Sequence, residues 1–482
     1  MIVGVDIGTS LTKAVVFDEA GVSVATACTR SEVHHLSGGR VEQDLGQVVG
    51  TVATVVREVT AQLPEPVTAL ALTGQGDGLW LRDEAGDAVR PAISWLDGRA
   101  NALLAKWQAD GVTREVFRRT GSGMFPGCAA AIMSFLDTHE PEALDRAVVA
   151  GYCVDAVLQQ LTGEITVDVS DASLPFLDPA TRKYDESAIA ACGLTHRRSL
   201  FAEPAPAKTV FRLDNRGAEL LGLPAGLPVT AGPFDLPASA IGAGVREPGD
   251  GILTAGTTLA CQVLTRDATF DPDGEPAGMF LCTPEPGEYL RAMPAMVGTA
   301  GIDWVCQLLG IDVADIDPLL ASSTPGAGGV QALPFLSVSG ERAPFVDATA
   351  RAQFSGLSLE TGRAELVRAL CESVAYAARH CFEAAGLSGR LYACGGGVRS
   401  AGWIRIFADV LGRPIVIPGD PGVGARGAVL TAADALGQPY DRDRWADNAR
   451  TVEFRPGNVE IYERGYADYQ ASLAAARGLW RL

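Results

Sequence analysis

The stretch Asp6-Ile7-Gly8-Thr9-Ser10-Leu11-Thr12-Lys13 lies between two short apolar runs, residues 2–5 and 14–17, whose pattern is typical of β-strands. Glycine in the connecting turn lets the backbone approach a ligand closely, and successive N–H groups in such a turn form an anion-binding concavity. Thr9 and Ser10 add hydroxyl donors, Lys13 adds a positive charge, and the carboxylate of Asp6 suits a hydrated Mg²⁺ ion. The stretch therefore predicts a hairpin that binds the terminal phosphate of a nucleotide.

A second copy of this phrase occurs far along the chain. Gly256-Thr257-Thr258-Leu259 follows another β-like run, residues 252–255, and a further strand is expected after it. Two copies about half a chain apart favour a duplicated domain with one phosphate-binding hairpin in each half. Two coincidental Gly-Thr turns are the alternative, because β proteins form such turns often.

Composition limits the classes of protein that fit. A chain of 482 residues exceeds the size of a single hydrophobic core, which predicts two large domains. The formal net charge of −19 disfavours a nucleic-acid partner. The ten cysteines contain no Cys-x-x-Cys pair, which favours reduced thiols in a cytoplasmic protein over a disulfide framework or a zinc site. We expect no signal peptide and no membrane partner, because the chain starts in a strand and lacks a long apolar run.

The order of the predicted elements indicates the fold class. Three strands in a meander, a helix over residues 43–63 capped by Asp44, and a strand over 67–72 open the chain. This order is typical of an actin-like or ribonuclease-H-like α/β domain. In the second half we expect a strong amphipathic helix over residues 363–385, with Thr361 as its cap.

Asp235 is the candidate for acid–base chemistry. It lies between a predicted strand end and a helix whose first turn contains Pro237, so its carboxylate is expected near the positive end of the helix dipole and ionised. There it can accept the proton of a substrate hydroxyl that attacks a γ-phosphate. Phosphoryl transfer has a loose transition state, so positioning and charge neutralisation supply most of the catalysis. A helix cap is the alternative role for this residue alone.

Other residues carry weaker signals. Gly395-Gly396-Gly397 suits backbone approach to an adenosine, whereas Ser400 stands where a dinucleotide fingerprint needs its third glycine. An NAD-dependent dehydrogenase is therefore a disfavoured alternative. The histidines show no metal-ligand spacing, and Trp80 and Trp95 are expected to pack in the core rather than to stack on a sugar.

Ordered phrases over nearly the whole chain resemble the FGGY family of carbohydrate kinases, which belongs to the actin-like and hexokinase-like superfamily. Besides the two hairpins and the region around Asp235, the matching phrases are Trp95-Leu96-Asp97-Gly98-Arg99-Ala100, Leu161-Thr162-Gly163-Glu164, Ser170-Asp171-Ala172-Ser173, residues 340–345, and the segment from Gly395 to Pro414. The resemblance implies two actin-like domains, with ATP and Mg²⁺ bound in the cleft between them.

The resemblance also implies domains and site residues. Residues 1–246 would bind sugar and phosphate, residues 247–437 would bind the nucleotide, and residues 438–482 would form a helical appendage packed on the kinase. Asp235 would be the catalytic base and Asp6 would lie near the metal. The implied ATP-binding residues are Thr9, Ser10, Lys13, Gly256, Thr257, Thr258, Gly298, Gly301, Gly395, Gly396 and Gly397. The implied substrate-binding residues are Gln75, Gly76, Asp77, Phe125 and Asp235.

Two departures from the family pattern bear on the substrate. Many members carry Met-His or Arg-Glu where this chain has Gly76-Asp77, and Leu236 replaces the polar residue that often follows the catalytic acid. These features are similar to the L-xylulose kinase and erythritol kinase branches. We hypothesise that Asp77 accepts hydrogen bonds from substrate hydroxyls.

The expected function is ATP-dependent transfer of the γ-phosphate to a hydroxyl of a small ketose or polyol of the xylulose, L-xylulose or erythritol type. A non-catalytic nucleotide-binding sugar sensor or scaffold of the same fold is the alternative. The sequence leaves the oligomeric state open, with a homodimer as one option.

Overall fold

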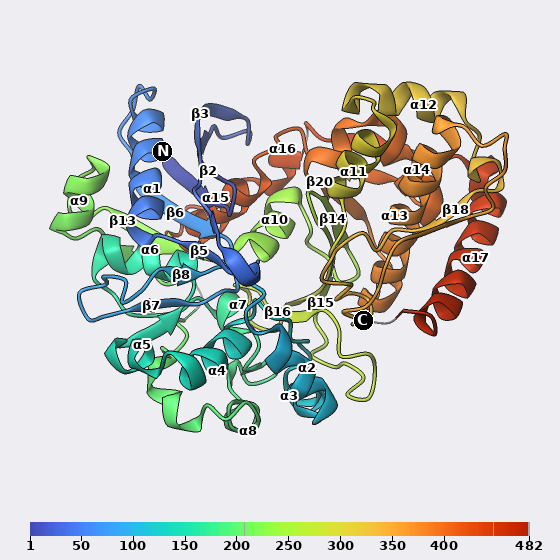
Figure 1. Ribbon diagram of the computed structural model, residues 1–482. Helices are drawn as coiled ribbons and strands as arrows, with labels where there is room; N and C mark the ends of the chain where they lie inside the picture. Colours follow the sequence, from blue (N-terminus) through green and yellow to red (C-terminus); the bar gives the residue numbers. More distant parts are fainter. Residues whose placement is uncertain (207, 447, 481–482) are drawn as a thin grey trace. The chain divides into compact units, whose positions relative to one another are not determined.

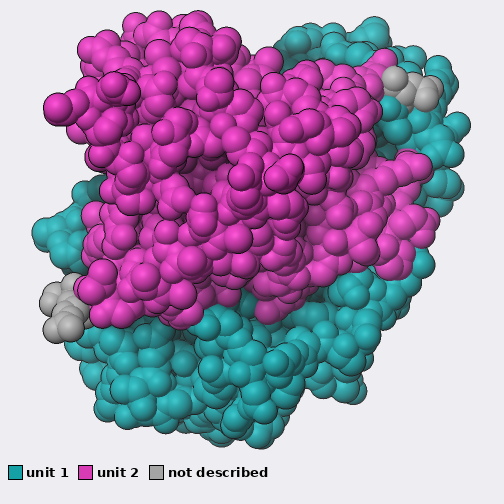
Figure 2. Space-filling view, turned by 90° about the vertical axis from the view of Figure 1, so that its right-hand side faces the viewer, with its two compact units in different colours: residues 1–244, 265–290, 422–447 teal, residues 245–264, 291–421, 448–482 magenta. Residues whose placement is uncertain are grey.

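The computed structural model describes residues 1–206, 208–446 and 448–480, and it divides into two compact units, shown in Figures 1 and 2. The first unit comprises residues 1–244, 265–290 and 422–447, and the second comprises residues 245–264, 291–421 and 448–482. Each unit is therefore built from several segments of the chain. Because the segments of the two units alternate along the sequence, the units do not test the predicted domain limits at residues 246 and 437, which stay a prediction.

A mixed sheet forms the centre of the first unit. β1 (Ile2–Ile7) pairs antiparallel with β2 (Leu11–Phe17) and parallel with β6 (Ala69–Gly74), which is in turn parallel with β13 (Pro228–Ala231). The strand order is β12-β13-β6-β1-β2-β3. The outer strands are β3 (Ser23–Arg30) and β12 (Phe211–Arg212). The predicted meander and the predicted strand near residues 67–72 are confirmed.

Helices cover both faces of this sheet. Val3, Val5 and Ile7 pack with α1 (Leu45–Thr60) and α6 (Cys153–Thr162). As predicted, Asp44 caps α1, accepting a hydrogen bond from the Gln47 backbone N–H at 2.8 Å. The opposite face packs against α15 (Val423–Ala435), which comes from the far end of the chain. α15 lies so close that a Cβ on Gly4 would be 2.6 Å from the Ala425 carbonyl oxygen.

The second unit repeats the arrangement of the first. β14 (Gly251–Ala255) pairs antiparallel with β15 (Leu259–Thr265) and parallel with β20 (Leu391–Cys394), as β1 pairs with β2 and β6. The sheet continues from β20 to β21 (Ile415–Ile417) and β22 (Arg450–Val452). The equivalent pairing of the two hairpins agrees with the predicted duplication, and the hairpins lie in different units.

The long predicted helix of the second half is confirmed as α13 (Arg363–Ala385), and Gly386, with φ of 86°, ends it. The predicted cap at Thr361 is wrong by one residue. Gly362 is the N-cap, and Glu365 accepts its backbone N–H at 3.0 Å, whereas the Thr361 hydroxyl accepts from the backbone N–H of Ser358. Glycine has no side-chain acceptor for the first turn, so this cap is made by the acid three residues later, which accepts the backbone N–H of Gly362.

The tail is not helical throughout, in contrast to the expectation. α16 (Arg442–Ala446) belongs to the first unit, and β22 adds a strand to the sheet of the second. Only α17 (Val459–Arg477), red in Figure 1, matches the predicted appendage, and it packs against α13 and β18 (Gln331–Leu333).

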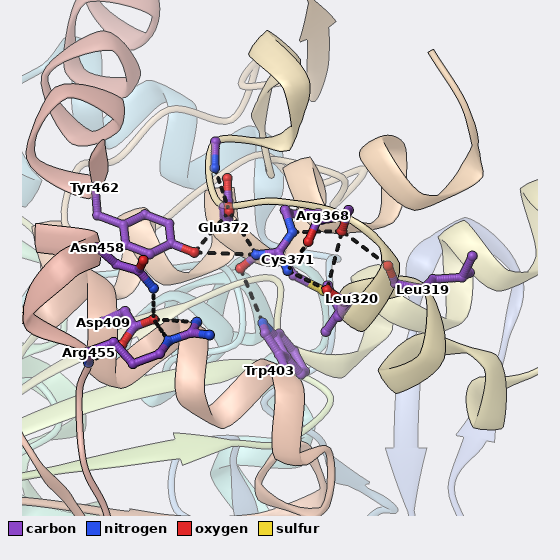
Figure 3. Close-up of polar contacts among 12 residues, drawn as sticks. Leu319, Leu320, Arg368, Cys371, Glu372, Trp403, Asp409, Arg455, Asn458 and Tyr462 are labelled. Atoms are coloured by element: carbon purple, nitrogen blue, oxygen red, sulfur yellow. Dashed lines mark hydrogen bonds and ion pairs between the residues drawn. The ribbon is translucent and has the colours of Figure 1, made fainter. Parts of the chain in front are cut away.

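Buried polar groups hold this tail in the second unit (Figure 3). Asp409, on α14 (Ala401–Leu411), accepts hydrogen bonds from the Arg455 backbone and guanidinium and from the Asn458 amide, at 2.6–2.8 Å. The Tyr462 hydroxyl on α17 donates to Glu372 of α13 at 3.0 Å. These bonds tie the start of α17 to two helices of the core.

The remaining helices are α2 (Asn101–Ala109), α3 (Val112–Thr120), α4 (Ala129–His139), α5 (Pro141–Arg146), α7 (Val169–Ala172), α8 (Glu186–Ala191), α9 (Asn215–Leu221), α10 (Asp235–Ala243), α11 (Thr299–Leu309) and α12 (Ile316–Ser322). The remaining strands are β4 (His34–His35), β5 (Val41–Gln43), β7 (Trp80–Arg82), β8 (Ala92–Ile93), β9 (Val149–Gly151), β10 (Leu177–Asp178), β11 (Lys183–Tyr184), β16 (Met279–Cys282), β17 (Tyr289–Ala295) and β19 (Gln353–Ser355). Among the helices described, none combines the length and apolar character needed to cross a membrane. The ten cysteines are free thiols, and all except Cys28 are buried.

Candidate active site

The carboxyl ends of three parallel strands define one edge of the sheet in the first unit. β1 leads into the turn at Gly8, β6 leads into the loop containing Asp77, and β13 leads into the segment that ends at Asp235. Open α/β sheets bind ligands at the carboxyl ends of their strands. The sheet topology thus collects the predicted acids of this unit on one side.

Asp235 is the first residue of α10, so its predicted place at a helix start is confirmed. Its pKa is nevertheless raised from 3.8 to about 8. Burial is the main cause of the raised pKa, and the negative charges of Asp6 and Asp77 raise it further. A hydrogen bond from the Leu236 backbone N–H lowers the pKa, but by less than burial raises it. The expectation that the helix dipole keeps Asp235 ionised is therefore wrong for the ligand-free protein. Loss of hydration and like charges outweigh the favourable helix end.

Asp6 is the last residue but one of β1 and faces Lys13 across the hairpin in the strand register. Burial raises the pKa of Asp6 to about 6, although the charge of Lys13 opposes the shift. The start of α15 lies against this carboxylate, since a Cβ on Gly424 would be 2.4 Å from the Asp6 Oδ2 atom. In the described residues, no group of three or more His, Cys, Asp or Glu side chains could hold a metal ion.

Thr9, Gln75 and Trp95 join in one hydrogen-bonded chain. The Thr9 hydroxyl donates to Gln75 Oε1 and accepts from the indole N–H of Trp95, both at 2.9 Å. The Gln75 amide nitrogen also lies 3.6 Å from the sulfur of Cys153. The expectation of core packing is therefore wrong for Trp95, because this side chain is half-buried and links its loop to the hairpin. The expectation is correct for Trp80, which is buried in the core.

The loop with Gly76 and Asp77 packs tightly against the segment before Asp235. Asp77 is buried and has a left-handed backbone, with φ of 56°. A Cβ on Gly76 would lie 2.6 Å from the ring of Phe234 and 2.9 Å from Asp171 Oδ1. Only glycine leaves this space, so Gly76 sets the shape of the loop.

The predicted wall residue Phe125 is buried beside this loop. Phe125 lies two residues before Gly127, and the carbonyl of Gly127 accepts a hydrogen bond from the Gly78 backbone N–H at 3.0 Å. A Cβ on Gly127 would overlap the Trp95 carbonyl, so only glycine fits there. Ser10, in contrast, is exposed at the hairpin turn.

Asp171 is a site residue to which sequence reasoning gave no role. Its carboxyl group is fully buried against Gly76, and neither oxygen makes a hydrogen bond within the described residues. Burial, followed by the charges of neighbouring acids, raises its pKa well above the ordinary value. The phrase Ser170-Asp171-Ala172-Ser173 was the available signal, but its pattern alone predicts no contact with the segment before Asp235.

Three glycine-rich segments converge in the second unit. The backbone N–H groups of Gly298, Thr299 and Ala300, at the start of α11, donate to the carbonyls of Gly256 and Thr257 at 2.7–3.2 Å. A Cβ on Gly395 would lie 2.6 Å from the Ala255 carbonyl oxygen, so the Gly395–Gly397 loop adjoins the same hairpin. Gly301 is buried and faces the apolar side chains of Val297, Leu336 and Leu370, whereas Gly256, Gly298 and Gly395 face backbone atoms of the hairpin.

Comparison with known proteins agrees with this organisation. Residues 1–242 match the N-terminal domain of the FGGY family of carbohydrate kinases, and residues 252–436 match its C-terminal domain. The chain is 35% identical to the erythritol kinase of Brucella abortus, over 100% of this chain and 97% of that protein. It is 25% identical to a probable L-xylulose kinase of Pasteurella multocida, over 99% of both chains.

A solved structure shows the same fold over the full length. The xylulose kinase of Rhodospirillum rubrum superimposes with a TM-score of 0.88 at 29% identity, covering 99% of each chain. The predicted two-domain actin-like α/β fold is confirmed. The chain therefore belongs to the FGGY family of carbohydrate kinases and is an ATP-dependent phosphotransferase that acts on a hydroxyl of a sugar or polyol.

Proposed function

We propose that this kinase phosphorylates a terminal hydroxyl of a small neutral polyol of the erythritol type, with small ketoses such as xylulose as poorer substrates. The observation that carries the proposal is that Asp77 and Asp235 follow the carboxyl ends of the neighbouring parallel strands β6 and β13, close enough for the charge of Asp77 to raise the pKa of Asp235. The full-length similarity to an erythritol kinase supports the same substrate class.

Asp235 is proposed as the catalytic base. As the substrate oxygen bonds to the γ-phosphorus, its O–H proton passes to the Asp235 carboxylate, the bond from the γ-phosphorus to the bridging oxygen breaks, and ADP leaves. Once ionised, a carboxylate with a raised pKa is a stronger base than an ordinary aspartate. Asp77 is proposed to accept hydrogen bonds from the other substrate hydroxyls, with Gln75, Gly76 and Phe125 shaping the pocket.

The phosphate groups of ATP are proposed to bind to the two Gly-Thr hairpins. In the first unit the ligands would be Ser10, Lys13 and the backbone at Thr9, whose hydroxyl is already bonded to Gln75. In the second unit Gly256, Thr257 and Thr258 would act in the same way, beside the positive end of the α11 dipole, whose first N–H groups already bond to the hairpin carbonyls. Gly298 and Gly395–Gly397 would line the remainder of ADP, and Gly301 would act by letting α11 pack closely.

Mg²⁺ is proposed as the metal, held through Asp6. Burial raises the pKa of both Asp6 and Asp235, and a divalent cation beside Asp6 would favour the ionised form of each. A site with few protein carboxylates suits Mg²⁺, which keeps several waters and binds substrate phosphates. When bound, the ion would neutralise charge on the phosphates. Asp6→Asn should weaken the dependence of ADP affinity on Mg²⁺ in calorimetric titrations, and an unchanged dependence would contradict this role.

We further propose a cytoplasmic location and a homodimer. The free, mostly buried thiols support a reducing compartment. Light scattering of the purified enzyme would test the oligomeric state directly. The family match, together with intact Asp6 and Asp235, leaves the non-catalytic sensor alternative without support.

A screen of ADP release over tetritols, pentitols and both enantiomers of the ketopentoses tests the substrate class. We expect the highest kcat/KM for a tetritol. A kcat/KM for either xylulose enantiomer that exceeds the value for every tetritol would overturn the erythritol-type proposal while leaving the kinase activity intact.

A further inference from the structure

The Pro233–Phe234 peptide group, which lies shortly before Asp235, forms hydrogen bonds through both its C=O and its N–H. The carbonyl of Pro233 accepts a hydrogen bond from the Thr73 hydroxyl at 2.7 Å, and the backbone N–H of Phe234 donates to the Ser170 hydroxyl at 3.1 Å. These two groups are the C=O and N–H of the same Pro233–Phe234 peptide. Both hydroxyl-bearing side chains are fully buried. They come from β6 and α7, so elements distant in sequence meet at this peptide.

The direction of the hydrogen bonds on Ser170 follows from its partners. Because the Ser170 oxygen accepts from Phe234, its own proton is donated elsewhere, and it points to Asp168 in a close contact. Asp168 also accepts the Ser170 backbone N–H at 2.8 Å. The resulting chain runs from the Phe234 N–H through the Ser170 hydroxyl to the Asp168 carboxylate.

Asp168 touches the same segment at a second point. Gly232 has φ of +87°, and a Cβ there would lie 2.3 Å from the Asp168 carboxyl carbon. The backbone of Gly232 also donates to the Leu72 carbonyl at 2.9 Å. The segment from Gly232 to Phe234 is therefore held by β6 on one side and by the Asp168–Ser170 turn on the other.

Thr73 links this segment to the rest of the site. In the sheet register Thr73 is the partner of Asp6, and it lies two residues before Gln75. A shift of the Pro233–Phe234 peptide would thus move Asp235 relative to both Asp6 and the substrate loop. Because a misplacement of about 1 Å costs roughly 100-fold in rate, the orientation of this peptide bears on catalysis.

We propose that Thr73 and Ser170 are positioning residues for Asp235, acting together on the two ends of the Pro233–Phe234 peptide. The proposal rests on the proposed role of Asp235 as the base. A purely structural role is the competing explanation, because buried hydroxyl and backbone groups are paired in most proteins. The two explanations differ in kinetics, since a positioning role lowers kcat in a folded enzyme that still binds both substrates.

The chain offers matched variants for both residues. Thr73→Val removes the hydroxyl and keeps the shape, whereas Thr73→Ser keeps the hydroxyl. Thr230→Val is the control for Thr73, because Thr230 is buried on the adjacent β13 and its hydroxyl makes no hydrogen bond within the described residues. Ser173→Ala is the control for Ser170→Ala, since Ser173 is buried one turn away and accepts the Cys282 backbone N–H at 3.0 Å.

In steady-state assays with erythritol and ATP, we expect Thr73→Val and Ser170→Ala to lower kcat by about 10–100-fold, with both KM values within about 3-fold of wild type. Thr73→Ser and both controls should keep kcat within about 3-fold of wild type. Thermal unfolding and circular dichroism would establish that each variant is folded. Should Thr73→Val fail to fold, the Ser170→Ala and Ser173→Ala pair carries the test.

The proposal that both residues position Asp235 is overturned if a folded Thr73→Val or Ser170→Ala variant retains wild-type kcat, or if Ser173→Ala lowers kcat as much as Ser170→Ala. Asp235→Asn separates this inference from the proposed function. An active Asp235→Asn enzyme would refute the base assignment itself. An inactive Asp235→Asn enzyme beside a fully active Thr73→Val enzyme would refute only the positioning role.

Discussion

The proposed catalytic role of Asp235 goes with a cost in stability. The Asp235 pKa of about 8 reflects burial and the nearby charges of Asp6 and Asp77. We expect Asp235→Asn to lower kcat by about 10²–10⁴-fold, the usual contribution of a general base. ADP affinity should stay within a factor of two, because the side chain is proposed to meet the substrate hydroxyl and not the nucleotide. Coupled assays and calorimetry would measure the two effects, and substantial residual turnover would contradict the base assignment.

The same substitution should stabilise the ligand-free protein. The folded pKa of Asp235 is raised above the unfolded value of 3.8, so the folded state holds a proton that the unfolded state releases. This contribution to stability is complete below pH 4 and is lost as the pH rises towards 8. Asn carries no such dependence, so the melting temperature of Asp235→Asn should exceed that of wild type by a margin that grows between pH 4 and pH 8. A margin independent of pH in metal-free buffer would show that the raised pKa is wrong.

Asp77 is predicted to set substrate affinity. Asp77→Asn keeps a side chain that tolerates the left-handed backbone at φ of 56° and removes the charge. Because charge-assisted hydrogen bonds are about twice as strong as neutral ones, the KM for the polyol should rise by about 10-fold while the KM for ATP stays unchanged. Asp110→Asn, at an exposed helix end, is the control for loss of one negative charge. An unchanged polyol KM would exclude direct contact between Asp77 and the substrate.

At the scale of the element, the attachment of the start of α17 to the core depends on the Asp409 carboxylate. The Asp409 side chain is fully buried and accepts four hydrogen bonds from Arg455 and Asn458. Asp409→Ala leaves these donors without their acceptor, and we expect the free energy of unfolding to fall by about 2–4 kcal/mol. Denaturant titration would measure this change. Glu460→Ala, which removes an exposed pair with Arg464, should change it by less than about 0.5 kcal/mol, and equal losses would refute the special role of Asp409.

At the scale of the whole molecule, the first unit is assembled from distant parts of the chain. α15 covers one face of its sheet, packing on Ile2, Val15, Phe17, Ala69 and Ala71. A fragment of residues 1–246 lacks this helix and would expose those side chains to water, so we expect it to aggregate or to remain partly unfolded. Co-expression with residues 247–482 should restore a folded, active enzyme. A monomeric 1–246 fragment with cooperative unfolding would instead establish the predicted boundary as that of an autonomous domain.

The sequence by itself determined the elements whose signals are local. The β1–β2 hairpin and its copy, the presence and cap of α1, the limits of α13, and the helix start at Asp235 all follow from periodicity, glycine turns and capping within a few residues. The predicted ends of α1, at residues 43 and 63, lie two to three residues outside the observed helix. The ordered phrases also identified the family. Thr361 shows the limit of such local signals, because two adjacent residues were both suitable caps.

Only the tertiary structure decided the pKa values and packing contacts that depend on residues far apart in the sequence. Desolvation and the charges of Asp6 and Asp77 raise the pKa of Asp235, although the helix end alone predicts an ionised group. The close packing of Gly424 on Asp6 and the bonding of Thr73 and Ser170 to one peptide likewise join residues separated by more than sixty positions. No local pattern encodes such contacts, because burial and electrostatic energy depend on every group that the fold brings near.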